Sequence, residues 1–241
     1  EIFSKNKSSK AICPSGASTG SFEAFEKRDF KDKKYLGKGV LQPVRIINEI
    51  ISKNLKNVNV HDQEKIDSIL IRLDGTKQKK KLGANSILAV SMAAKKLSAK
   101  LNNKQLFKCF FRKSNFKMPY PLMNIINGGA HANNGLRIQE FMIRPDKAKS
   151  FSDALRMSFL VINNLRNLIK KLKYSTSVGD EGGFAPMISD NEKALKLIVK
   201  SINLSGFKNG KDISICLDVA ANELFKKKKI LYPLKEIYLS R

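Results

Sequence analysis

The stretch that decides the fold is PLMNIINGGAHANNGLRIQEFMIRP, which occupies residues 121–145. It contains a first apolar run, residues 122–126, that stops at the pair Gly128-Gly129. A second apolar run, residues 138–143, stops before a proline. Short apolar runs bounded by glycine and proline are typical of buried β-strands. The stretch therefore predicts two strands with a glycine-rich loop between them.

Two amphipathic helices and a third strand are predicted after this stretch. Residues 152–172 and residues 189–201 carry apolar side chains at helical spacing along one side. Ser189 and Glu192 have the spacing of a capping box at the start of the second helix. Residues 212–219 alternate, which predicts a strand. Its side chains divide into Ile213, Ile215 and Leu217 on one face and Ser214, Cys216 and Asp218 on the other.

The order strand, strand, helix, helix, strand is how an α/β barrel begins, with the large aliphatic side chains toward the helix layer. The chain before this region has an α+β pattern. There we expect a hairpin over residues 1–13 and helices over residues 22–29, 43–51, 67–73 and 85–101. The expected domains are an N-terminal α+β domain, residues 1–116, and the first part of an α/β barrel, residues 117–241.

Composition limits the class of protein. The chain has 241 residues, 42% of them hydrophobic, and carries 46 Lys plus Arg against 21 Asp plus Glu, for a net charge of +25. Such an apolar content in periodic stretches excludes a disordered polycation, and no apolar run reaches the roughly 18 residues that a membrane span needs. No signal-peptide pattern follows Glu1. We expect a soluble globular protein without membrane insertion.

The positive charge has two interpretations, a solvated surface and a nucleic-acid interface. Only nine of the 46 basic residues are Arg, and the Lys residues are spread along the chain with small clusters at residues 77–81 and 226–229. Recognition of phosphates and bases favours the planar fork of Arg. The composition therefore favours a solvated surface over nucleic-acid binding.

The three cysteines, Cys13, Cys109 and Cys216, are widely spaced and form no C-x-x-C pair. A disulfide framework and a zinc site are therefore not expected. Cys13 and Cys216 lie in apolar stretches, where we expect them to be buried as small hydrophobic residues. Free thiols indicate a reducing compartment, so the expected location is cytoplasmic.

Several polar residues lie where stability alone does not call for them. The loop of residues 15–20 is rich in hydroxyls, although it also has the composition of an ordinary turn. His131 follows two glycines, which by itself is a weak sign of function. Glu140 follows Gln139 inside an apolar strand, so it is either half of a buried structural ion pair or a catalytic group.

Two carboxylate segments are more informative. Residues 179–183 read GDEGG, and the adjacent carboxylates of Asp180 and Glu181 repel each other unless a cation or a substrate compensates. Asp218 lies at the end of its strand, where barrel enzymes hold ligands and catalytic groups. Oxygen ligands without cysteine pairs favour Mg²⁺ or Mn²⁺ over zinc.

Seven motifs together resemble the enolase family, in family order and over essentially the whole chain. They are PSGASTG from Pro14, LGKGV from Leu36, GANSILAVSMA from Gly83, MNIINGGAHA from Met123, QEFMI from Gln139, GDEGGFAP from Gly179 and LDVAANELF from Leu217. The resemblance implies a Mg²⁺-dependent lyase, phosphopyruvate hydratase, which interconverts 2-phosphoglycerate and phosphoenolpyruvate in glycolysis. It also implies a cytoplasmic homodimer.

The resemblance implies a role for each matching residue. Ser18 matches a serine of the mobile loop that closes over the substrate and the second metal ion, and His131 matches a loop histidine near the phosphate. Gln139 and Glu140 match the substrate-side pair. Glu181 matches the glutamate that donates a proton to the departing hydroxyl. Asp218 matches the first of three carboxylate ligands of the tightly held Mg²⁺, in a family scheme that uses a lysine or histidine base.

The chain also departs from the family pattern. Two further metal carboxylates, the lysine base and the phosphate-holding groups come from later barrel strands in the family, and the first N-terminal strand has no match here. We therefore expect a partial enolase that is inactive alone. The alternative is a degenerate, enolase-derived basic protein that binds without catalysis. Coding sequence beyond Arg241 that supplies the missing groups favours the enzyme, and a stop codon there favours the alternative.

Overall fold

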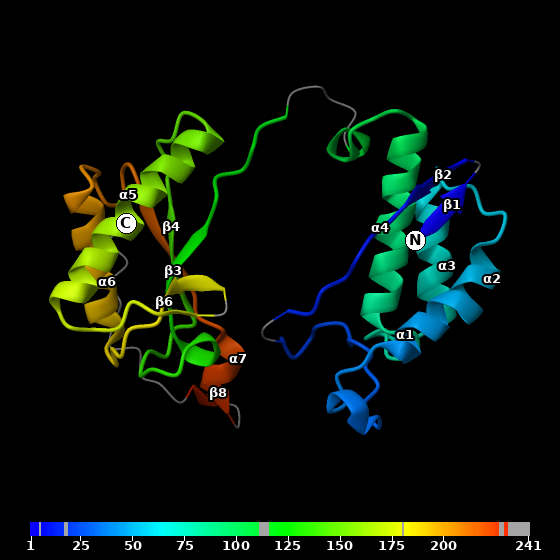
Figure 1. The fold of residues 1–241 in the computed structure, drawn as a ribbon, viewed down its shortest axis with the longest axis horizontal. Helices are drawn as coiled ribbons and strands as arrows, with labels where there is room; N and C mark the ends of the chain where they lie inside the picture. The colour runs from blue at the N-terminus through cyan, green and yellow to red at the C-terminus, as the bar shows by residue number, and fades with distance from the viewer. Residues whose placement is uncertain (5, 17–18, 111–115, 180, 227–228, 231–241) are drawn as a thin grey trace. The chain divides into compact units, whose positions relative to one another are not determined.

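The computed structural model describes residues 1–4, 6–16, 19–110, 116–179, 181–226 and 229–230. At residues 225, 226, 229 and 230 it describes the backbone alone. The chain divides into two compact units, Glu1–Phe116 and Lys117–Arg241 (Figure 1).

The first unit packs a short hairpin and several helices around one core. Strands β1 (Ile2–Ser4) and β2 (Lys7–Ser9) are antiparallel and contact the longest helix of the unit, α4 (Ala84–Leu101). The remaining helical elements are η1 (Lys33–Tyr35), α1 (Leu41–Arg45), the π-helical turn η2 (Ile46–Ile51), α2 (Ser52–Leu55), α3 (Gln63–Asp74) and η3 (Leu106–Cys109). Their buried side chains are Ile46, Ile51, Ile66, Leu70, Leu82, Val90 and Ala94.

One predicted helix of this unit is wrong. Residues 22–29 form no helix, because their backbone bonds to a distant loop instead of to residues four positions earlier. The Phe25 N–H donates to Gln78 O at 2.7 Å, and the Ala84 N–H donates to Phe25 O at 2.8 Å. A polar helical pattern without a buried stripe offers little to compete with these tertiary bonds.

Other boundaries of the first unit shift. The second strand is β2 and not residues 11–13. Helix α3 begins before the predicted residue 67, because the Asp62 carboxylate accepts from the Lys65 N–H and caps it. The helix predicted over residues 43–51 is the middle of a continuous helical segment from Leu41 to Leu55. The helix predicted over residues 85–101 is confirmed as α4 to within one residue.

The second unit is built on a mixed five-stranded sheet of order β5-β6-β3-β4-β7. Its strands are β3 (Met123–Asn127), β4 (Glu140–Arg144), β5 (Val178–Gly179), β6 (Gly182–Phe184) and β7 (Ser214–Asp218). Strand β4 is antiparallel to both of its neighbours, β3 and β7. The start of β4 therefore lies beside the carboxyl ends of β3 and β7, with Glu140 opposite Asn127 on one side and Asp218 on the other.

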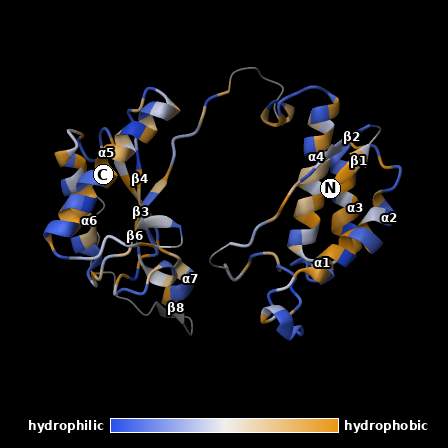
Figure 2. Ribbon diagram, viewed as in Figure 1, coloured by the Kyte–Doolittle hydropathy of each residue, from blue (hydrophilic) through white to orange (hydrophobic). Residues whose placement is uncertain are grey.

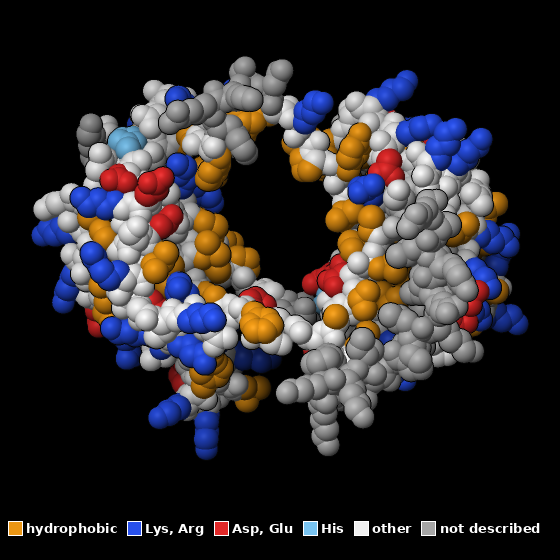
Figure 3. Space-filling view, turned by 180° about the vertical axis from the view of Figure 1, so that it is seen from behind, with side chains coloured by type: hydrophobic (Ala, Val, Ile, Leu, Met, Phe, Trp, Pro, Cys, Tyr) orange, Lys and Arg blue, Asp and Glu red, His pale blue; other side chains and the backbone are white. Residues whose placement is uncertain are grey.

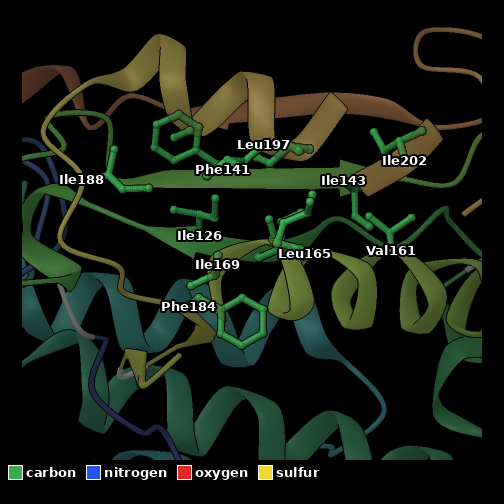
Figure 4. Packing of buried hydrophobic residues seen from close by; sticks show 14 of the residues in the cluster. Ile126, Phe141, Ile143, Val161, Leu165, Ile169, Phe184, Ile188, Leu197 and Ile202 are labelled. Atoms are coloured by element: carbon green, nitrogen blue, oxygen red, sulfur yellow. The ribbon is translucent and has the colours of Figure 1, made fainter. Parts of the chain in front are cut away.

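Two helices pack on each other beside this sheet, α5 (Phe151–Lys171) and α6 (Asn191–Leu204). Sheet and helices together form part of an α/β barrel. Figure 4 shows Leu165 and Ile169 of α5 and Leu197 and Ile202 of α6 pointing toward the strand residues Ile126, Phe141 and Ile143. Ile213, just before β7, is fully buried in the same core, and Ile215 and Leu217 pack against it, so the predicted helix-facing side of this strand is confirmed. In Figure 2 the helices alternate hydrophobic and hydrophilic sides, as this packing requires.

The predicted capping box of α6 is wrong. The cap is Asp190, whose carboxylate accepts from the Glu192 N–H at 2.8 Å, and the helix begins at Asn191. After β7 the chain continues in α7 (Ala221–Leu224), followed by the strand pair β8 (Phe225–Lys226) and β9 (Lys229–Ile230).

Cys13 and Cys216 are half-buried and not fully buried as predicted, and Cys109 is also a half-buried free thiol. Burial and the nearby Glu26 charge raise the pKa of the Cys13 thiol. Across the described residues, no helix combines the length and apolarity that crossing a membrane requires. Figure 3 shows Lys and Arg side chains scattered over the visible face between uncharged ones.

Candidate active site at the carboxyl edge of the sheet

Three predicted site residues meet at one edge of the sheet of the second unit. His131 Nδ1 lies 3.3 Å from Glu181 Oε2 and 3.5 Å from Glu140 Oε1. The histidine side chain is 3% exposed, the Glu140 side chain 16% and the Glu181 side chain 37%. The cluster is thus buried at the imidazole and open at Glu181, which suits a site that a small molecule enters from one side.

The turn after β3 places His131. The Gly128 N–H donates to Gln139 O at 2.9 Å, and the chain then forms the short helical turn η4 (Gly129–His131). A Cβ on Gly128 would lie 2.4 Å from Ile138 O, so no larger residue fits without moving the backbone. This close approach folds the chain back at the end of β3 and buries the imidazole beside Glu140.

The hairpin of β5 and β6 places Glu181. Gly182 and Gly183 follow it with φ of +75° and +68°, a left-handed conformation that glycine adopts without strain. Strand β6 pairs in parallel with β3 through Ile126 and Phe184. Because β3 also pairs with β4, the hairpin brings Glu181 to the edge where Glu140 begins its strand.

The electrostatics of the cluster centre on Glu140. Burial raises the pKa of this carboxyl to about 7, with further contributions from a hydrogen bond to Glu181 and from the charges of Glu181 and Asp218. Near neutral pH the Glu140 carboxyl therefore holds its proton more readily than an ordinary glutamate does. A carboxyl with a raised pKa beside a second carboxyl is suited to proton transfer.

Asp218 ends β7 on the same edge. It pairs in register with Glu140, and its backbone carbonyl accepts from the Gln139 N–H at 3.1 Å. The Asp218 side chain is exposed, and its Oδ1 accepts from the Ala220 N–H at 2.9 Å, which orients the carboxylate. An exposed, oriented carboxylate at a strand end can accept a hard cation.

Gln139 and Ser18 complete the predicted set. Gln139 is 4% exposed, and its Oε1 is buried without a hydrogen-bond partner among the described residues. A buried amide oxygen in this state is available to a ligand that brings a donor. Ser18 lies outside the described residues.

The sequence analysis did not identify Asn127 as a site residue, although its side chain lies against the hairpin that carries Glu181. Asn127 is fully buried at the end of β3, and its side chain bonds to the backbone of Gly182 and Gly183. The signal in the sequence is a polar residue at the end of an apolar run, just before two glycines. That pattern does not reveal the partner 55 residues later, which only the folded chain brings close.

The cluster of His131, Glu140 and Glu181 also contains possible metal ligands. Within the part of the chain that the structure describes, one ligand atom each from His131, Glu140 and Glu181 lie within 4.8 Å of one another. An imidazole with two carboxylates suits a borderline cation, whereas Mg²⁺ favours oxygen ligands alone. For Mg²⁺, the exposed carboxylate of Asp218 is the better donor.

Comparison with known proteins identifies relatives over both units. The family model described as "Enolase, N-terminal domain" matches residues 1–110, and the model described as "Enolase, C-terminal TIM barrel domain" matches residues 115–237. The chain is 72% identical over 229 residues to a curated protein named Enolase from Pelagibacter ubique (strain HTCC1062). The match covers 95% of this chain and 55% of that relative, so the chain spans about half of the relative's length.

Proposed function

Because the chain belongs to the enolase family, we propose that the protein carrying it is a phosphopyruvate hydratase, a lyase of glycolysis. It interconverts 2-phosphoglycerate and phosphoenolpyruvate with the help of Mg²⁺. The first unit corresponds to the N-terminal α+β domain of such an enzyme, and the second to the start of its barrel. The cytoplasm, where glycolysis runs, is the expected location.

One observation supports this function above the others. Glu140, Glu181 and Asp218 come from three separate segments and converge on one edge of the sheet, beside the buried His131. Such a concentration of carboxylates costs folding free energy unless protons or a bound cation compensate their charge. Functional sites commonly carry this cost. Stability alone would favour neutral or oppositely charged residues at these positions.

The reaction needs one proton removed and one supplied. Dehydration takes a proton from the carbon next to the carboxylate and hydroxide from the adjacent carbon, and the hydroxide leaves as water only if it is protonated. Glu181 faces the open side of the cluster and supplies that proton. Glu140, with its pKa of about 7, shares a hydrogen bond with Glu181 and restores the proton afterwards.

The remaining residues hold the substrate. Gln139 offers its buried amide, and His131 presents a ring edge to the phosphate side. Ser18 lies outside the described residues and keeps the substrate role that the family resemblance implies. No residue of this chain matches the base that removes the carbon-bound proton.

Asp218 would be a ligand for Mg²⁺, and the ion would supply positive charge that stabilises the developing negative charge of the substrate carboxylate. The exposed and oriented carboxylate described above fits this role.

A homodimer is proposed as the assembly. Helix α5 exposes Phe151, Leu155 and Phe159 at four-residue spacing, which forms an apolar stripe on one side of the helix. A second copy of the chain can cover such a stripe. Phe159→Glu should shift the sedimentation of the protein from dimer to monomer, whereas Met187→Glu, at an equally exposed methionine, should not. Unchanged sedimentation in both variants would contradict this interface.

The function is tested by following phosphoenolpyruvate formation by ultraviolet absorbance, using the protein that carries this sequence, 2-phosphoglycerate and excess Mg²⁺. Turnover that chelation with EDTA abolishes and added Mg²⁺ restores is the expected result. A protein that binds neither substrate nor Mg²⁺ in calorimetry, and shows no turnover, would instead be a binding protein derived from the enolase fold.

A further inference from the structure

Asn127 has no role in the function proposed above, although it is the fully buried last residue of β3. We propose that Asn127 is a positioning residue, whose side-chain amide fixes the hairpin that carries Glu181. It thereby sets where that carboxylate meets Glu140 and His131. The inference rests on the proposed function, because it concerns the acid of the same site.

The hydrogen bonds of Asn127 carry this inference. Its Nδ2 donates to the carbonyl oxygens of Gly182 and Gly183, to the latter at 3.1 Å. Its Oδ1 accepts from Asn124 Nδ2 at 2.6 Å. Both amide protons and the amide oxygen are therefore used. The amide orientation is settled by its partners, because two carbonyl oxygens can only accept and must face Nδ2.

A second asparagine extends the connection. Asn134 Nδ2 donates to the backbone oxygen of Asn127 and to that of Pro186, both at 3.0 Å. The end of β3 is thus joined to β6 itself and, through Asn134, to Pro186 after it. Asn124 Oδ1 is buried without a hydrogen-bond partner among the described residues, but every polar group of the Asn127 side chain is satisfied. A buried amide satisfied in this way holds the backbone segments that it joins in one arrangement.

The buried Phe184 side chain anchors the end of the hairpin in the core, but the part next to Glu181 has fewer attachments among the described residues. Strand β6 pairs with β3 at one position, Ile126 with Phe184. The two residues after Glu181 are glycines with positive φ, which have no side chains to anchor them. The two bonds from Asn127 Nδ2 are therefore a major restraint on the position of Glu181.

The packing around the amide is equally specific. A Cβ on Gly179 would lie 2.7 Å from Asn127 Nδ2, and one on Gly183 would lie 3.2 Å from it. The amide therefore fills the space that these two glycines leave open on either side of Glu181. A proton donor displaced by about 1 Å loses much of its effect, which is why this restraint matters for catalysis.

The test is Asn127→Asp, which keeps the size of the side chain but turns an oxygen toward the Gly182 and Gly183 carbonyls. Repulsion between these oxygens should move the hairpin. The matched control is Asn164→Asp on α5, where the amide bonds to Leu160 O at 3.2 Å and to Ser205 Oγ at 2.9 Å. Both variants lose two amide donor bonds, but only one of them touches the hairpin.

The first measurement does not depend on activity. The chain has two histidines, so long-range ¹H–¹⁵N spectra report His131 with His61 as an internal reference. Asn127→Asp should shift the ring signals of His131, because Glu181 moves away from it, and should leave those of His61 in place. Asn164→Asp should move neither. Unmoved His131 signals in a folded Asn127→Asp protein would overturn the inference.

A milder variant covers the case in which Asn127→Asp does not fold. Asn124→Ala removes only the bond that orients the Asn127 amide. It should produce a smaller shift of the same His131 signals and faster hydrogen exchange at Gly182 and Gly183, while helix α5 keeps its protection. Unchanged exchange at both glycines would count against the restraint.

The second measurement links the restraint to catalysis. In the active protein, Asn127→Asp should lower kcat by about tenfold or more with KM unchanged, because the hairpin delivers the proton donor and not the binding groups. Asn164→Asp should leave both constants unchanged. A rise in KM at constant kcat would overturn the positioning role. If the parent shows no turnover, the proposed function fails, and the histidine spectra still decide whether Asn127 holds the hairpin.

Discussion

Glu140 is the first residue of β4 and pairs in register with Asp218, the last residue of β7. This pairing exists because β4 runs antiparallel to a neighbour whose carboxyl end forms the site edge. It sets two acidic side chains next to each other, and the Asp218 charge contributes to the raised pKa of Glu140. The proton-holding group and the metal-binding group of the proposed site are thus joined by one strand pair.

The first prediction concerns Asp218→Asn, which keeps the size of the side chain and removes its charge. It should weaken Mg²⁺ binding at least tenfold and reduce turnover to a similar or larger extent. Isothermal titration calorimetry measures the affinity. Asp190→Asn is the control, because asparagine also caps a helix and should leave α6 and Mg²⁺ affinity unchanged. Equal Mg²⁺ affinity in parent and Asp218→Asn would remove Asp218 from the metal site.

The second prediction concerns Glu181→Gln. Loss of the acidic proton should nearly abolish dehydration, while exchange of the substrate α-proton with solvent deuterium continues, because a different group removes that proton. Exchange is followed by NMR and dehydration by absorbance. Glu192→Gln, at an exposed glutamate on α6, should alter neither rate. If exchange and dehydration fall together while substrate still binds, the division of roles is wrong.

The third prediction concerns the pH dependence of stability. The pKa of Glu140 is raised from 4.5 to about 7 in the folded protein, so this group favours folding most below pH 4.5 and loses that contribution as pH rises through about 7. In Glu140→Gln the side chain cannot ionise, so this loss of stability with rising pH is absent. The variant should match the parent at low pH and exceed its unfolding free energy by up to roughly 3 kcal/mol near pH 8.

Urea unfolding at a series of pH values measures this difference. The exposed Glu49 of the first unit provides a control, since Glu49→Gln should give a curve parallel to that of the parent. A Glu140→Gln protein that is less stable than the parent above pH 7 would show that the ionised Glu140 is compensated in the fold.

The fourth prediction concerns the turn before His131. Gly128→Ala places a Cβ 2.4 Å from Ile138 O and 2.6 Å from Leu136 Cβ, so the backbone must move. Stability should fall by about 2 to 3 kcal/mol, and the ring signals of His131 should shift. Gly206→Ala, whose Cβ would meet nothing within 4 Å, should cost about 1 kcal/mol from its positive φ alone and leave His131 unchanged. Equal losses in the two variants would mean that the close approach at Gly128 is unimportant.

Local periodicity was sufficient for the elements that bury a continuous stripe. The helices predicted over residues 85–101 and 152–172 agree with α4 and α5 to within one residue at each end. The helix-facing side of β7 was also predicted correctly. In these segments the side chains that fill the core repeat with the period of the backbone, so the sequence contains the information locally. The motifs likewise indicated the enolase family, which the comparisons established.

Elements whose backbone partners lie far away were not predictable in this way. Residues 22–29 have a helical pattern, yet they bond to Gln78 and Ala84 across more than fifty residues of chain. The antiparallel direction of β4, which sets Glu140 beside Asp218, depends on strand pairing and leaves no trace in the composition of either strand. The restraint of the Glu181 hairpin by Asn127 is of the same kind.

The family, the long helices, the core face of β7 and the chemical types of the site residues can therefore be recognised from the amino-acid sequence. Which of those site residues meet depends on the folded arrangement of the chain. Helical and strand periodicity result from the geometry of neighbouring residues, whereas His131, Glu140 and Glu181 come together through hydrogen bonds between segments that are distant in the chain. Such bonds depend on the direction and register of strands, which are set when the whole sheet packs against α5 and α6.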